Sequence, residues 1–129
     1  MVKIEVETEV RPTEDVEKVK QAVLNVYSGD LVLVGGGNYR FLRGVSMDLR
    51  SLEPLRKLIK SQQIEPAAKS YLLRRMSNGE LTILLHKQAA FVSKISFIDD
   101  AKESPLGPIK IHMTGDNLEE VVNYLTGWT

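Results

Sequence analysis

Two polar motifs in the second half of the chain carry the side chains most capable of chemistry. His86-Lys87-Gln88 follows an alternating apolar segment, and Ser104-Pro105-Leu106-Gly107-Pro108 follows an acidic turn. An imidazole can serve as a general base, and a serine hydroxyl becomes a nucleophile when a base activates it. Ser104 lies outside a Gly-x-Ser-x-Gly motif and has no evident base nearby in the sequence. The two motifs therefore favour binding over catalysis, and we expect the protein not to be an enzyme.

The residues that could hold a metal ion are few and poorly spaced. His86 and His112 are the only histidines, and there is no cysteine. A zinc site usually needs three or four spaced ligands, which are not visible around either histidine. Asp99, Asp100 and Glu103 lack the alternate oxygen ligands and the glycine of an EF-hand loop. We predict no metal and no cofactor; a small enzyme that uses His86 with the Asp99–Asp100 turn is the alternative.

Length and composition indicate one globular domain. The chain has 129 residues and is 43% hydrophobic, which is enough for a single core, so we predict one domain over residues 1–129. No apolar run approaches the ~20 residues that cross a bilayer, so we expect no membrane association. The absence of cysteine fits a reducing compartment, and we expect a cytoplasmic protein.

The charge is neutral overall but unevenly distributed. Residues 1–38 carry four basic and seven acidic side chains, residues 39–87 carry ten and four, and residues 88–129 carry three and six. The middle of the chain is therefore net +6, and each flank is net −3. Such segregation can create one positive surface on a neutral protein, and anionic partners respond to that local field. An equally weighted alternative is a set of solvated helix faces that simply carry Lys and Arg.

Hydrophobic periodicity predicts the elements. Alternation with period two predicts strands over residues 2–10, 39–45, 81–86, 94–98 and 109–113, and a short apolar run predicts one over residues 31–34. Helical spacing predicts helices over residues 13–27, 51–60, 66–77 and 116–125. Thr13, Ser51 and Asp116 are the expected N-caps, Asn78-Gly79 is the expected helix end, and Trp128 is expected to pack at the end of the last helix. Residues 88–90 fit a bend or a short helical turn equally well.

The predicted order of elements is β-α-β-β-α-α-β-β-β-α. Because most strands alternate, one face of the sheet should be covered and the other at least partly wet. This pattern is typical of a single layered α+β domain with a mostly antiparallel sheet of about six strands and helices packed on it.

A binding surface for RNA is the function that the polar residues favour. Arg and Lys engage phosphates through charge, while His86 and Gln88 can bond sugar or base edges. Only eight residues are aromatic, which favours reading of backbone and shape over base stacking. The candidate contacts are Arg56, Lys57, Lys60, Arg74, Arg75, His86, Lys87, Gln88, Ser104 and Gly107.

Several motifs resemble a known family. His86-Lys87-Gln88-Ala89-Ala90, Ser96-Phe97 and Glu103–Ile109 look like those of the archaeal uncharacterised protein family 0201, as do Arg11–Asp15 and the Ala67-Ala68 helix. That family is classed with predicted RNA-binding, exosome-linked archaeal proteins. The resemblance implies an archaeal cytoplasmic protein with a ribosomal-protein-like fold, similar to the large-subunit protein that holds 5S RNA. It also implies RNA as a partner and association with the exosome or the ribosome, and it brings no catalytic residues.

A protein-interaction or self-associating module with no nucleic-acid role is the alternative function. Its basis is the neutral net charge and the apolar C-terminal helix that ends at Trp128. A homodimer is the simplest form of that alternative.

Overall fold

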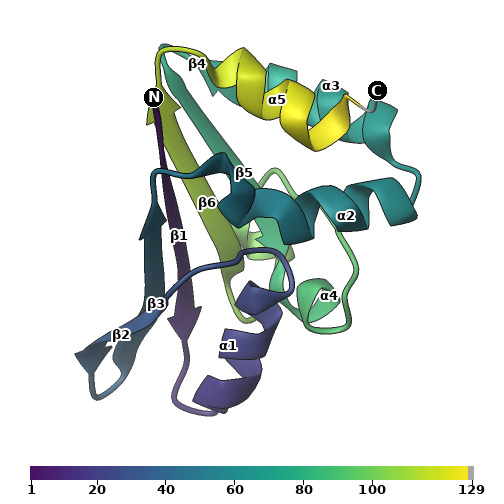
Figure 1. The fold of residues 1–129 in the computed structure, drawn as a ribbon. Coiled ribbons are helices and arrows are strands. Elements are labelled where there is room, and N and C mark those ends of the chain that lie inside the picture. Colours follow the sequence, from purple (N-terminus) through teal and green to yellow (C-terminus); the bar gives the residue numbers. More distant parts are fainter. Residues whose placement is uncertain (128–129) are drawn as a thin grey trace.

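The computed structural model describes residues 1–127, and within them the chain forms one six-stranded antiparallel sheet (Figure 1). The strand order across the sheet is β2-β3-β1-β6-β5-β4. The strands are β1 (Val2–Val10), β2 (Val32–Gly36), β3 (Tyr39–Ser46), β4 (Met76–Ser77), β5 (Glu80–His86) and β6 (Pro108–Gly115). The helices are α1 (Val16–Leu24), α2 (Glu53–Ser61), α3 (Glu65–Arg75), α4 (Lys87–Phe91) and α5 (Leu118–Thr126), with 3-10 turns η1 (Leu49–Leu52) and η2 (Ala101–Glu103).

The helices lie on one side of the sheet (Figure 1). Along β1 the apolar side chains of Ile4, Val6 and Val10 are buried, while the intervening charged side chains are partly exposed. The period of two along this strand therefore separates a covered face from an open face. The structure confirms the predicted α+β fold class, with an open antiparallel sheet and helices packed on it.

The main core lies between the covered face and the helices. Ile83 and Ile111 of the sheet are fully buried with Leu72 of α3 and Leu125 of α5 in one apolar cluster. Apolar burial of this kind is the dominant favourable contribution to folding. The core fixes α2, α3 and α5 over one end of the sheet, whereas α1 and α4 contact each other at the other end (Figure 1).

The predicted strand at residues 94–98 is reduced to a single bridge. Phe97 pairs with Leu85, flanked by bonds from His86 N–H to the Ser96 carbonyl and from Ile98 N–H to the Leu84 carbonyl, each 3.0 Å. The segment thus runs along the edge of β5 beyond the end of β4. The pairing with β5 does not continue beyond Ile98, because the 3-10 turn η2 begins at Ala101. Residues 88–90, for which two interpretations were open, belong to α4.

The three predicted N-caps all differ from those in the structure. Asp15, not Thr13, caps α1, and its carboxylate accepts from Glu17 N–H at 2.9 Å. Asp48, not Ser51, caps the η1 turn that precedes α2. Asn117, not Asp116, is the N-cap of α5, and its side chain makes no capping bond. Neighbouring Asp, Asn, Ser and Thr residues are nearly equivalent caps, so local sequence does not choose among them.

Asn78-Gly79 forms a hairpin turn rather than a helix end. The helix α3 stops at Arg75, and the two residues that follow it pair with the start of β5. Asn78 and Gly79 have φ of +52° and +74°, which suits an Asn-Gly pair in a tight two-residue turn. The expected packing of Trp128 lies outside the described residues.

Candidate nucleic-acid interface

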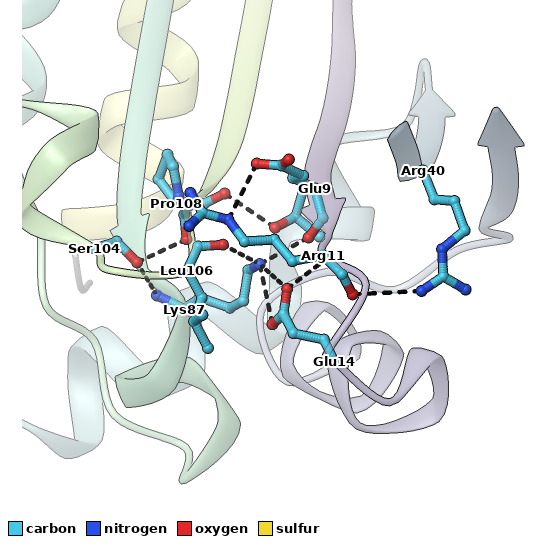
Figure 2. A network of polar contacts seen from close by, with 10 residues as sticks. Glu9, Arg11, Glu14, Arg40, Lys87, Ser104, Leu106 and Pro108 are labelled. Atoms are coloured by element: carbon cyan, nitrogen blue, oxygen red, sulfur yellow. Dashed lines mark hydrogen bonds and ion pairs between the residues drawn. The ribbon is translucent and has the colours of Figure 1, made fainter. Parts of the chain in front are cut away.

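Lys87 is the centre of a buried polar junction (Figure 2). Its side chain is only 3% exposed, and its ammonium donates to the carbonyls of Glu9 at 2.7 Å and Leu106 at 2.6 Å. The third partner is the Glu14 carboxylate, with Nζ–Oε1 at 3.1 Å. An ammonium has three N–H donors, and here each of them has an acceptor. The junction connects the end of β1, the turn that leads into α1 and the loop before β6 to α4.

The environment of Lys87 explains why this charge is tolerated inside the fold. Burial lowers the pKa of the Lys87 ammonium below its usual value, and the hydrogen bond that the ammonium donates to the Glu14 carboxylate opposes that shift. Glu14 is itself nearly buried and also accepts from Arg11 N–H at 2.9 Å. The prediction that Lys87 contacts phosphate is therefore wrong, because its ammonium is covered and fully bonded.

The loop around Ser104 and Gly107 serves the same junction. Ser104 is 2% exposed, and its hydroxyl donates to the Gly107 carbonyl at 2.7 Å while accepting from Lys87 N–H at 3.2 Å. Gly107 is buried with φ of +86°, a conformation that glycine adopts at little cost. Neither residue is accessible to RNA, so the structure contradicts both as contact residues.

His86 and the acidic turn have local structural roles. The His86 Nδ1 accepts from Ala89 N–H at 3.2 Å and so caps α4. Glu103 accepts from the amides of Asp99 and Asp100 at 2.9 and 2.8 Å, and Asp100 caps η2. His86 and Asp100 are thus bonded to the backbone of their own turns, whereas the Asp99 carboxylate pairs with Arg74 at 2.7 Å. Gln88 is exposed, at the rim of a cavity of about 300 Å³ between α1 and α4.

The predicted arginines differ in how firmly they are held. Arg56 donates through Nε to the Tyr124 carbonyl at 3.0 Å and pairs with Glu53 at 3.2 Å. Arg75 donates through Nε to the Thr82 carbonyl at 2.7 Å and is largely covered. Arg74 is more than half exposed, and its 2.7 Å contact with Asp99 is a surface ion pair. Because surface ion pairs are weak, Arg74 can exchange its carboxylate for a phosphate more easily than the other two arginines can.

Exposed lysines lie on the elements around the turn between α2 and α3, a region that we call the α2–α3 corner. It comprises Lys57, Lys60, Lys69 and Lys94, all exposed. Lys94 joins the group because Gln62, at the end of α2, bonds both the amide and the carbonyl of Ile95 at 2.6 and 3.2 Å. The prediction included Lys57 and Lys60 but missed the other two. The position of Lys94 follows from the Gln62 contact, which sequence spacing does not reveal.

The open face of the sheet has a mixed charge. Arg43 of β3 contacts both Glu7 at 3.2 Å and Glu5 at 3.7 Å on β1. On β6, His112 and Lys110 lie opposite these two glutamates. The central carboxylates would repel phosphates, so this face is a poorer RNA surface than the α2–α3 corner.

Among residues 1–127, no group of three or more His, Cys, Asp or Glu side chains is placed to hold a metal ion. None of the helices in that part of the chain is both long and apolar enough to span a membrane.

Comparisons with known proteins agree with this architecture. A family model described as RNA binding matches residues 3–114. The chain is 42% identical to the UPF0201 protein of Metallosphaera sedula, over 97% of this chain and 87% of that protein, and 39% identical to that of Sulfurisphaera tokodaii, over 98% and 88%. The crystal structure of the UPF0201 protein from Methanococcus jannaschii superposes with a TM-score of 0.81 at 27% identity, covering 98% of this chain and 94% of the other.

The fold and these matches define the class as a small α+β protein built on one open antiparallel sheet, with relatives in archaea. The chain belongs to the UPF0201 family, as the motifs around His86 and Ser104 suggested.

Proposed function

We propose that the protein is a non-catalytic RNA-binding module that reads the phosphate backbone and the shape of a structured RNA. The observation that carries this proposal is the match of residues 3–114 to a family model described as RNA binding. A cytoplasmic location and association with the ribosome or the exosome are part of the same proposal.

The surface chemistry indicates where the RNA would lie. The four lysines of the α2–α3 corner are exposed, and the acidic residues nearest to them along the chain are Glu53, Glu65 and Asp99, each at least four residues away. Lys57 and Lys60 are three residues apart on α2, so they lie on neighbouring turns of one helix face. Arg74 offers a further contact at the far end of α3. Flexible ammonium groups of this kind suit phosphates, which carry charge but little sequence information.

The form of the surface favours structured RNA over single strands. Among the aromatic side chains of residues 1–127, Tyr39 and Phe91 are exposed, but they lie on different elements, β3 and α4. Reading of single strands usually needs a row of aromatic side chains on which bases stack. A contact made through phosphates and 2′-hydroxyls needs no such row.

The test is the salt dependence of binding to a labelled RNA hairpin, followed by fluorescence anisotropy. The logarithm of affinity should fall linearly with the logarithm of salt concentration, and each lysine–phosphate contact removed should reduce the slope by about one unit. We expect Lys57→Gln/Lys60→Gln to reduce the slope by about two units.

The matched control is Lys18→Gln/Lys20→Gln, which removes the same charge from the exposed surface of α1. Its slope should equal that of the natural protein. Equal slopes for all three proteins would show that the RNA phosphates do not contact Lys57 and Lys60 of the α2–α3 corner. Failure of the natural protein to bind any structured RNA at low salt would reject the function itself.

A further inference from the structure

We infer that the free edge of β2 is a self-association surface, on which β2 of a second copy of this chain pairs to join the two sheets. β2 is the last strand at one end of the sheet, and β3 is its neighbour on the inner side. All five of its residues are exposed, including Val32 at 62%, Leu33 at 44% and Val34 at 41%. An exposed apolar edge strand is a ready template for another strand.

The edge lacks the features that usually prevent such pairing. Natural edge strands are commonly protected by a charged side chain, a proline or a covering loop. Residues 31–38, Leu-Val-Leu-Val-Gly-Gly-Gly-Asn, contain neither a charge nor a proline. Arg43, which faces Val32 across the β2–β3 pair, is held by Glu5 and Glu7 on its other side. The free edge of β2 is thus electrically neutral. A second identical strand can pair there without charge repulsion, whereas RNA phosphates would find no cation.

Backbone geometry indicates which groups are free. The two-residue loop Gly37–Asn38 makes Gly36 and Tyr39 the closing pair of the hairpin. In such a hairpin the closing pair is hydrogen-bonded, and hydrogen-bonded positions then alternate along the strands. The backbone groups of Val34 and Val32 therefore point toward β3, and those of Leu33 point to the free edge.

One register uses these free groups best. In an antiparallel pair centred on Leu33, this residue faces its own counterpart, and Val32 faces the second copy's Val34. Branched apolar side chains then meet on both faces, which is the pairing that stabilises sheets. Gly35, with φ of +89°, falls near the end of the pair, where its unusual backbone disturbs the ladder least. Two-fold symmetry of this kind is the commonest arrangement of soluble homodimers.

The expected dimer is weak. A strand pair of five residues buries less than the roughly 1,600 Å² of a standard interface, so we expect a Kd on the order of 10 µM. Sedimentation velocity over a range of protein concentrations should show a shift from one chain mass to two. Leu33→Lys should abolish that shift, with its circular dichroism spectrum unchanged. Val92→Lys, at another exposed apolar position, should leave it intact.

A crosslinking experiment tests the register independently of stability. The chain has no cysteine, so a single introduced one reports one position. Under mild oxidation Leu33→Cys should form a disulfide-linked dimer, because position 33 faces itself at a Cα–Cα distance of about 5.5 Å. Val34→Cys and Val92→Cys should crosslink at least tenfold more slowly. The proposal is overturned by a natural protein that stays monomeric to about a hundred times that Kd, a Leu33→Lys variant that still dimerises, or equal crosslinking at all three positions.

Discussion

The ammonium of Lys87 lies 3.1 Å from the carboxylate of Glu14, although 73 residues separate them, and both side chains are nearly buried. The pair brings the first turn of α4 against the segment that leads into α1. Two backbone carbonyls complete the bonding of the ammonium. A residue whose type suggested ligand binding is therefore a structural crosslink between distant parts of the chain (Figure 2).

Lys87→Met should destabilise the protein strongly. The substitution leaves the Glu14 carboxylate buried without its cation, and breaking a buried pair in this way typically costs about 3–5 kcal/mol of unfolding free energy. Urea denaturation followed by circular dichroism measures the change. Lys20→Met, on the exposed surface of α1, is the control and should shift the unfolding free energy by less than about 0.5 kcal/mol.

The double variant Lys87→Met/Glu14→Gln separates the charge from the packing. It removes the buried carboxylate charge as well, so it should be more stable than Lys87→Met alone. A double variant as unstable as the sum of the two single variants would contradict a direct interaction between these side chains.

Ser104→Ala should cost about 1–3 kcal/mol of unfolding free energy. The hydroxyl bonds both the Gly107 carbonyl and the Lys87 amide, and its loss leaves two buried backbone groups without partners. Thermal and urea unfolding measure the effect. Ser96→Ala removes an exposed hydroxyl and should be nearly neutral; similar losses in both variants would show that Ser104 is no more important than a surface serine.

The stability of the α2–α5 contact should fall at high pH. Burial, and then the hydrogen bond to Glu53, raise the pKa of Tyr124 to about 12, above its usual value of 10.0. Below pH 10.0 this contribution to stability is complete, because the phenol is protonated in both folded and unfolded chains. Between pH 10.0 and about 12 the unfolded chain loses the proton first, so the unfolding free energy falls as pH rises.

Tyr124→Phe should lose less unfolding free energy than the natural protein as pH rises, because phenylalanine has no hydroxyl to ionise. At neutral pH the variant should be less stable by about 1 kcal/mol, the net value of one hydrogen bond. Urea unfolding midpoints measured from pH 8 to pH 11 test both points. Tyr39→Phe, at an exposed tyrosine, should follow the natural protein at every pH; identical alkaline slopes for the natural protein and Tyr124→Phe would refute the assignment.

Asp99→Asn should tighten RNA binding modestly. Asp99 lies 2.7 Å from Arg74 and 3.5 Å from Arg75, and its removal leaves these guanidinium groups without that neutralising charge. Surface pairs are worth at most about 1 kcal/mol, so we expect a gain of no more than about fivefold in affinity. Asp116→Asn changes the net charge equally on an exposed turn before α5 and should gain less. Equal gains would mean that RNA affinity depends only on the net charge of the protein and not on the release of Arg74 from Asp99.

Local pattern in the sequence was sufficient for most of the fold. The alternation from Val2 to Val10 identified β1 and its buried face, because a period of two depends only on neighbouring residues. The segment at Lys94–Ile98 was overestimated, since the room left beside β5 depends on where β4 ends. The caps were misplaced among chemically similar neighbours, as with Thr13 and Asp15.

The candidate site was harder to predict, because accessibility is a tertiary property. Lys87 and Ser104 have the polar side chains of a binding motif, yet contacts with Glu9, Glu14 and Leu106 bury the lysine. Nothing within a few residues of Lys87 indicates those partners. Lys57 and Lys60, which lie off the apolar stripe of α2, could be recognised as exposed because helical periodicity determines their face.

The most direct test of RNA binding at the α2–α3 corner is an NMR titration of the isotope-labelled protein with an RNA hairpin. Amide signals of residues 57–69 and 92–96 should move most, in a salt-dependent manner, while those of β1 should stay nearly fixed. Saturable changes centred on Glu5 and Glu7 of the open face, or no change at low salt, would contradict the account.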